Sequence, residues 1–180
     1  MEPSYFAKRV IALAGGPVRL RKLIDADMRA FDQAWNRDTD LIGRLLRAHL
    51  AVEHFMTACL GRRNPRLGSL EAARLTFAQK LALLDDKDVI LAAIRPGIKR
   101  LNELRNGLAH RPSRPLQDGD VEPLLAVGIF RALREALAVP NAPSTEPIDI
   151  VEEFARFAAG MLQHKISDLG HLIGQALADS

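Results

Sequence analysis

The stretch TDLIGRLLRAHLAVEHFMTACLG, residues Thr39 to Gly61, decides the fold class of this chain. Its apolar residues recur at three- and four-residue spacing, which predicts an amphipathic helix. Asp38 or Thr39 can cap the start of this helix, and Gly61 is expected to end it. The expected apolar members are Leu41, Leu45, Leu46, Ala48, Leu50, Val52, Phe55, Met56, Cys59 and Leu60.

The same spacing recurs on both sides of this stretch, and no strand-like alternation of useful length occurs. The chain is therefore predicted to be all-α. The expected helices are Val18 to Trp35, Asp38 or Thr39 to Leu60, Ser69 to Leu84, Asp86 to Ile94, Pro96 to His110, Val121 to Leu137, and Asp149 to Ala178 with a bend or break near Gly160 and Gly170. Pro112 and Pro115 are expected to stop the fifth helix, and three prolines exclude a helix from VPNAPSTEP, residues 139–147. Residues 1–37 are expected to form an N-terminal accessory helical segment, and residues 38–180 a single globular domain.

Length and composition exclude several classes of protein. The chain has 180 residues, of which 48% are hydrophobic and 26% charged, as in ordinary soluble domains and unlike disordered chains. Its single cysteine, Cys59, cannot form an internal disulfide, so a reducing cytoplasm is the expected location. The apolar run before Gly15 and Gly16 is too short for a signal peptide, and no run is long enough to span a membrane.

Charge is distributed unevenly along the chain. The formal net charge is only +3, which is weaker than is usual for a protein that coats nucleic acid. Between Arg95 and Arg114, however, six basic residues stand against one acidic residue, Glu103. From Asp118 onward the sign reverses, with ten acidic and four basic residues. A polyanion would prefer the basic segment, although charge alone favours a solvated helix face that keeps the protein soluble.

The basic segment contains the string IKRLNELRNGLAHRP, residues Ile98 to Pro112. At about 100° per residue, its three leucines form one face of a helix, and the polar residues Lys99, Glu103, Asn106 and His110 lie on the opposite face. Arg105 falls at the margin of the apolar face and must reach outward with its long side chain. An amide, an imidazole, a lysine and a carboxylate are therefore expected to face solvent together.

The spacing Arg105-Asn106-x-x-x-His110 resembles the R-x4-H motif, commonly R-N-x3-H, of HEPN domains. The helix from Arg44 to Leu60, which includes Glu53, is similar to the first core helix of many bacterial HEPN proteins. The segments Leu75 to Leu84 and Leu101 to Pro112 follow in the order typical of stand-alone bacterial members. The resemblance covers residues 38–112 well and the last helices only in general character, and it implies an antiparallel helical bundle with an extra N-terminal helix.

The resemblance also implies a function, namely metal-independent RNA cleavage, as in toxins of toxin-antitoxin pairs and in phage-defence proteins. His110 would transfer the proton of an RNA 2′-hydroxyl, Arg105 would stabilise the negative charge on the phosphate, and Asn106 would orient the histidine or donate to the phosphate. No metal or cofactor is implied, and two motifs would face each other across a symmetric homodimer. A cognate antitoxin or regulatory protein is a further expected partner. The residues expected to contact RNA are Lys99, Arg100, Arg111 and Arg114, with Glu53 and Glu103 in supporting positions.

A second hypothesis is a non-catalytic interaction or regulatory module, similar to the mannitol operon repressor group. A helix-terminal histidine can simply complement the helix dipole, and Arg105 can pair with Glu53 of the neighbouring helix instead of binding phosphate.

Other candidate sites are weaker. His49, Glu53 and His54 depart by one residue from the zinc-binding helix patterns, so a helix-surface hydrogen bond is favoured over a metal site. The arginine-rich stretch GRRNPRLG, residues 61–68, can grip a phosphate backbone but is as simply explained as a solvated loop. Cys59 follows the apolar pattern and is expected to be buried and inert.

Overall fold

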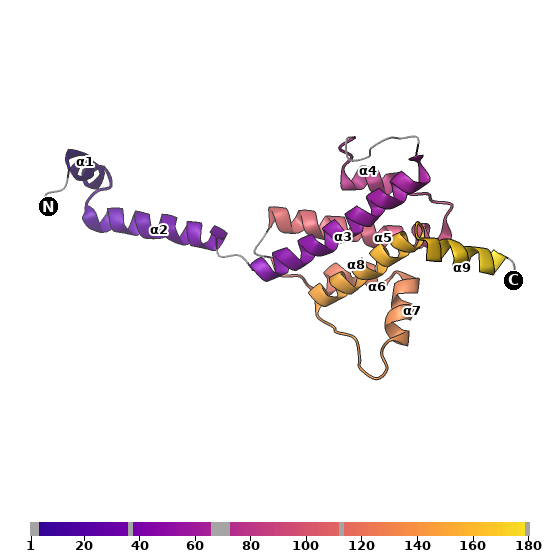
Figure 1. Ribbon diagram of the computed structural model, residues 1–180. Helices are drawn as coiled ribbons and strands as arrows, with labels where there is room; N and C mark the ends of the chain where they lie inside the picture. Colours follow the sequence, from indigo (N-terminus) through magenta and orange to yellow (C-terminus); the bar gives the residue numbers. More distant parts are fainter. Residues whose placement is uncertain (1–3, 36–37, 66–72, 112–113, 179–180) are drawn as a thin grey trace. The chain divides into compact units, whose positions relative to one another are not determined.

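The computed structural model describes residues 4–35, 38–65, 73–111 and 114–178. Every regular element within these ranges is a helix, which confirms the all-α prediction (Figure 1). The helices are α1 (Tyr5–Leu13), α2 (Pro17–Trp35), α3 (Thr39–Arg63), α4 (Phe77–Ala82), α5 (Val89–His110), α6 (Asp118–Leu125), α7 (Gly128–Ala136), α8 (Pro147–His164) and α9 (Asp168–Ala178).

The chain divides into two compact units, Met1–Asp38 and Thr39–Ser180. The first unit contains α1, which the sequence patterns did not predict, and α2, whose bounds they predicted to within one residue. The Ser4 hydroxyl caps α1 by accepting a hydrogen bond from the backbone N–H of Ala7. Gly15 and Gly16 then turn the chain into α2 with φ angles of 80° and 114°, which side-chain-bearing residues rarely adopt.

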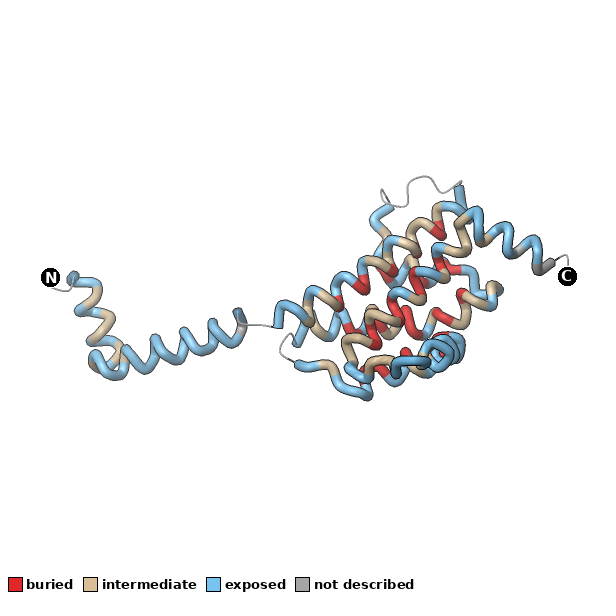
Figure 2. Tube along the Cα trace, turned by 60° about the horizontal axis from the view of Figure 1, so that its bottom comes forward, coloured by how far each residue is buried: buried red, intermediate tan, exposed pale blue. Residues whose placement is uncertain are grey.

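The second unit holds the hydrophobic core (Figure 2). The long helices α3 and α8 pack along each other, and α5 and α6 pack against α8. Cys59 is fully buried, and burial raises the pKa of its thiol, as expected for an inert cysteine. The largest fully buried side chains are Phe130, Phe154, Leu45, Met56, Leu91, Ile94, Ile98, Leu101, Leu124, Leu162, Val52 and Val121.

The predicted break between residues 94 and 96 is wrong, because α5 runs without interruption from Val89 to His110 with Pro96 inside it. Its start is capped by the Asp88 carboxylate, which accepts hydrogen bonds from the backbone N–H groups of Ile90 and Leu91. Pro96 points to solvent, while buried residues on both sides of it, Leu91, Ile94, Ile98 and Leu101, fix the two halves of the helix to one core. Packing of both halves therefore offsets the backbone hydrogen bond that proline removes.

Two other helix boundaries also differ from the prediction. Helix α3 continues past Gly61 to Arg63, and Asn64 ends it by donating from its side chain to the Leu60 carbonyl. Residues 73–76 are not helical, and α4 begins only at Phe77, where Thr76 and Gln79 form a capping box. Residues 69–72 of the expected helix lie outside the described ranges.

The two expected C-terminal helices are each divided into two. Residues 126–127 separate α6 from α7, because Val127 has an extended backbone. Gly160 does not interrupt α8, and the break falls instead at residues 165–167. There the Ser167 hydroxyl accepts a hydrogen bond from the Gly170 N–H, and a Cβ on Gly170 would lie 1.7 Å from the His164 carbonyl oxygen. Only glycine fits this close approach between α8 and α9.

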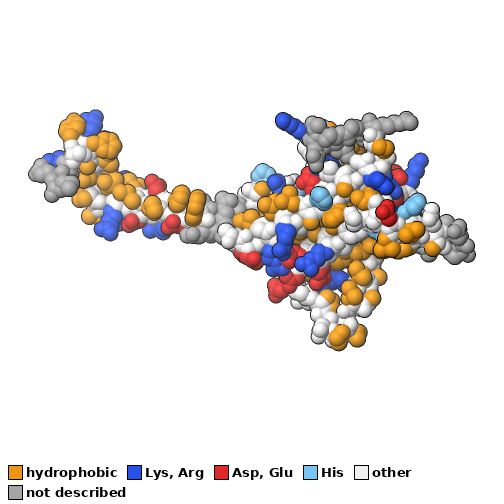
Figure 3. Space-filling model, in the orientation of Figure 1, with side chains coloured by type: hydrophobic (Ala, Val, Ile, Leu, Met, Phe, Trp, Pro, Cys, Tyr) orange, Lys and Arg blue, Asp and Glu red, His pale blue; other side chains and the backbone are white. Residues whose placement is uncertain are grey.

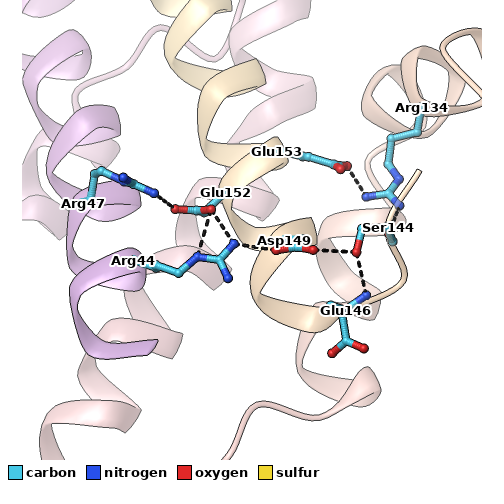
Figure 4. A network of polar contacts seen from close by, with 8 residues as sticks. All are labelled: Arg44, Arg47, Arg134, Ser144, Glu146, Asp149, Glu152 and Glu153. Atoms are coloured by element: carbon cyan, nitrogen blue, oxygen red, sulfur yellow. Dashed lines mark hydrogen bonds and ion pairs between the residues drawn. The ribbon is translucent and has the colours of Figure 1, made fainter. Parts of the chain in front are cut away.

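A network of ion pairs joins α3, α7 and α8 (Figure 4). The Arg44 guanidinium on α3 contacts Asp149 and Glu152 on α8, and Arg47 also pairs with Glu152. From α7, Arg134 pairs with Glu153 and donates to the carbonyl of Ser144, whose hydroxyl donates to Asp149. Hydrogen bonds from Ser144 and Arg44 lower the pKa of Asp149, and those from Arg44 lower the pKa of Glu152.

Candidate functional site

The last two turns of α5 carry the three residues of the predicted motif. Arg105, Asn106 and His110 are all exposed, and His110 is the final residue of the helix. The Arg105 Nη1 donates a hydrogen bond of 3.1 Å to the Asn106 Oδ1. A guanidinium has five N–H donors, so most of the hydrogen-bonding capacity of Arg105 remains open to an anion.

Glu53 does not pair with Arg105. Its Oε1 instead accepts a hydrogen bond of 2.8 Å from the Lys80 Nζ, which α4 brings against α3. Within the described part of the chain, Asn106 is therefore the partner of Arg105, and it is neutral. Arg105 carries an uncompensated positive charge at the surface, as a phosphate-binding residue requires.

His49 lies behind this surface, between α3, α4 and α5. Its side chain is buried, its ring stacks on Phe77 with centroids 4.2 Å apart, and its Nε2 donates to the Asn102 Oδ1 at 3.1 Å. Asn102 lies one helical turn before Asn106, so this bond attaches the motif-bearing part of α5 to α3. The expected helix-surface role of His49 is wrong, because α4 and α5 cover it. The apolar residues Leu45, Ala48, Val52 and Met56 recur at three- and four-residue spacing around His49, and this spacing was the sequence signal that could have predicted its burial.

The buried imidazole has one unpartnered atom. His49 Nδ1 makes no hydrogen bond to the residues that the structure describes, and the Glu53 Oε2 lies 3.9 Å away. Burial lowers the pKa of His49, the Asn102 hydrogen bond and Glu53 oppose this, and the positive charges of Arg105 and Lys80 lower it further.

The basic residues around the motif fall into two groups. Arg100 and Arg114 hold the buried carboxylate of Asp120, at 3.0 Å and 3.2 Å, and Arg100 also donates to the Asp120 carbonyl. Arg100 therefore attaches the start of α6 to α5, and Arg114 attaches the connection between these helices to the start of α6. Lys99 and Arg111 are exposed.

Glu103 lies on the same exposed face of α5. It contacts Arg100 at 3.3 Å and Lys99 at 4.0 Å, so it offsets part of the local positive charge. It therefore acts on the basic residues, and within the described ranges it forms no hydrogen bond or ion pair with Arg105, Asn106 or His110.

A small hollow of about 70 Å³ lies beside the motif, between α5 and the start of α6. It is lined by Arg100, Glu103, Gly107, Arg111, Arg114 and Asp120, together with apolar side chains. Sites for cofactors and drug-sized ligands usually measure roughly 300 to 1,000 Å³. The hollow is thus too small for a nucleotide, and a polyanion would contact the outer face of α5 instead.

One copy of the chain does not bring Arg105 and His110 to the same side of α5. Five residues separate them, which corresponds to about 140° around the helix. Asn106 and His110, four residues apart, do share a face.

No cluster of potential metal ligands occurs in the described ranges, and none of the described helices is long and apolar enough to cross a membrane. Comparisons with protein-family models, with curated proteins and with solved structures gave no match.

Proposed function

We propose that this protein is a metal-independent endoribonuclease of the HEPN type. The observation that carries the proposal is the exposed Arg105 guanidinium, which is bound to a neutral amide beside an exposed histidine. His110 accepts the proton of an RNA 2′-hydroxyl, whose oxygen attacks the adjacent phosphate. Arg105 stabilises the added negative charge, and the leaving 5′-oxygen takes up the proton that the His110 imidazolium returns. The products are a 2′,3′-cyclic phosphate and a 5′-hydroxyl.

The 140° separation within one chain favours a composite site. In a symmetric dimer that brings two α5 helices together, Arg105 of one copy can approach the phosphate from the side opposite His110 of the other. Lys99 and Arg111 then contact the flanking phosphates. Arg100 and Arg114 attract the RNA phosphates through their positive charge more than through direct contact, since both already form ion pairs with Asp120. A role in a toxin-antitoxin pair or in phage defence, with an acidic protein partner, is part of this proposal.

A non-catalytic interaction module is the second candidate. It is favoured by exposed apolar side chains near the C-terminus, namely Ile129 and Leu133 on α7, Leu137 directly after it, and Leu169 and Leu172 on α9. Figure 3 shows apolar side chains at the surface of this part of the molecule. Surfaces of this kind bind other proteins more often than RNA. In this case His110 and Arg105 would be dispensable for activity.

Cleavage of a mixed-sequence RNA in the presence of EDTA tests the proposal. We expect the purified protein to release 2′,3′-cyclic phosphate ends, and the variants His110→Ala and Arg105→Ala to lose at least about a hundredfold in rate. His171→Ala, which removes an exposed histidine on α9, is the matched control and should cleave normally. Equal cleavage by all four proteins, or none by a folded dimer, would support the interaction module instead.

A further inference from the structure

The N-terminal unit exposes an unusual amount of apolar surface for its size (Figure 3). Neither α1 nor the stretch of α2 from Arg21 to Gln33 contains a buried residue. The large apolar side chains with exposed fractions above one half are Tyr5, Phe6, Leu13, Val18, Leu23, Ile24, Met28, Phe31 and Trp35. Single exposed apolar residues are ordinary, but contiguous patches of this extent mark interaction surfaces.

On α2 these side chains form one stripe. At about 100° per residue the apolar stripe is about 140° wide, and it is already partly ordered because Phe31 and Trp35 stack with their centroids 5.7 Å apart. Val18 points away from the stripe. The stripe consists of Leu20, Leu23, Ile24, Met28, Phe31 and Trp35.

The exposed area of the stripe is sufficient for a dimer interface. Five of its side chains are 51% to 73% exposed. With roughly 200 Å² for a large side chain, two copies would remove on the order of 1,100 Å² from water, which exceeds the 1,000 Å² that separates specific interfaces from incidental contacts.

The charges of α2 argue against a membrane surface as the partner. Helices that lie on anionic membranes carry mainly Lys and Arg on the polar face. Helix α2 carries four basic residues and three aspartates, and one of these, Asp27, lies within the width of the apolar stripe. Insertion of the stripe into lipid would bury this carboxylate among acyl chains, which offer no hydrogen-bond partner, whereas a protein interface can hold water beside it.

We propose that α2 pairs in antiparallel orientation with α2 of a second copy of this chain. A twofold axis near residues 26 and 27 sets Arg21 opposite Asp32 of the second copy, on the same flank of the stripe. The same register sets Leu23 opposite Ala30, and it places Ile24 and Met28 within one residue of facing each other. One arrangement therefore accounts for two charge pairs, two contacts between a large and a small side chain, and a seam that is apolar except at Asp27. Within one copy, Arg21 and Asp32 are about 16 Å apart along the helix and cannot pair.

The axis also brings Asp27 near Asp27 of the second copy, within the width of the stripe. These like charges weaken the pairing, so Asp27→Asn is expected to tighten the dimer about threefold at low salt. A membrane-bound or intramolecularly docked α2 would show no such gain in self-association.

Sedimentation equilibrium of the full-length chain over micromolar concentrations tests the surface. We expect one association step that Phe31→Asp weakens at least about thirtyfold. Val18→Asp, which places the same charge on the opposite face of α2, should leave association unchanged. Helicity measured by circular dichroism verifies that both variants stay folded. A step that Phe31→Asp leaves intact would place the association outside α2 and would overturn the proposal. A monomeric wild type, or one that instead binds vesicles containing phosphatidylserine, would also overturn it.

Charge reversal tests the register. Arg21→Glu and Asp32→Arg should each weaken association about tenfold, and the double variant should recover to within about threefold of wild type. Since the two residues cannot meet within one copy, such a recovery requires antiparallel contact between copies. Additive losses in the double variant would exclude this register. Neither experiment depends on ribonuclease activity, so the result is independent of the function proposed above.

Discussion

Burial of His49 makes the stability of the fold dependent on pH. Its pKa in the folded protein lies below the ordinary value of 6.5, because burial disfavours the imidazolium, and Lys80 and Arg105 act in the same direction against Glu53. The neutral imidazole contributes its full stabilisation when the pH is above 6.5, the ordinary pKa of histidine in an unfolded chain. This stabilisation is lost as the pH falls toward the lower pKa that His49 has in the folded protein. We expect the wild-type unfolding temperature to fall between about pH 7 and pH 5, and that of His49→Gln to change much less.

The matched control for this residue is His54→Gln, which removes an exposed histidine from the same helix and should retain the wild-type pH dependence. The carboxylates of Asp149 and Glu152 titrate below their ordinary values of 3.8 and 4.5 and do not contribute in this range. An unchanged slope in His49→Gln would show that another group governs the transition.

At the scale of elements, the packing of α5 on α8 depends on a missing side chain. Gly97 is buried, and a Cβ there would lie 2.2 Å from the Cζ of Phe154, a ring with no exposed surface. In a helix, Gly→Ala ordinarily stabilises by up to about 1 kcal/mol. At Gly97 the steric conflict outweighs this gain, so we expect Gly97→Ala to lower the unfolding free energy by about 1 to 3 kcal/mol.

Gly107 provides the comparison on the same helix. It is exposed, and a Cβ there would meet no atom within 4 Å. Gly107→Ala should therefore stabilise the protein by several tenths of a kcal/mol, up to about 1 kcal/mol. Urea unfolding of the two variants measures whether each substitution raises or lowers the free energy of unfolding. If both variants changed stability in the same direction, helix propensity and not contact with Phe154 would control the effect.

At the scale of the whole molecule, stability resides in the second unit. Every residue of the hydrophobic core lies between Leu45 and Leu162, and none belongs to α1 or α2. A fragment of residues 39–180 should therefore unfold cooperatively, with a Tm within about 4 °C of the full chain. The comparison is made at low protein concentration, where self-association adds little. A larger loss, or a broad transition, would mean that the N-terminal unit contributes to the core.

Local features of the sequence were sufficient for much of this fold. The all-helical class, the bounds of α2, the start of α3 and the outward position of Lys99, Asn106 and His110 all follow from apolar periodicity and capping residues. These signals act between residues a few positions apart, so they can be read without knowing which segments pack against each other in the fold. For the same reason, the exposure of the candidate motif was predictable, although its chemistry stays a proposal.

The remaining features depend on contacts between residues far apart in the sequence. Leu91 and Leu101 hold α5 continuous through Pro96 because both halves of the helix contact one core. Asp120 engages Arg100 from 20 positions away, which removes that arginine from the freely available basic surface. His49 is buried because α4 and α5 cover it. Periodicity and capping residues predicted most of the helical segments. Only the tertiary structure decided which polar groups are paired, since pairing depends on the neighbours that folding brings together.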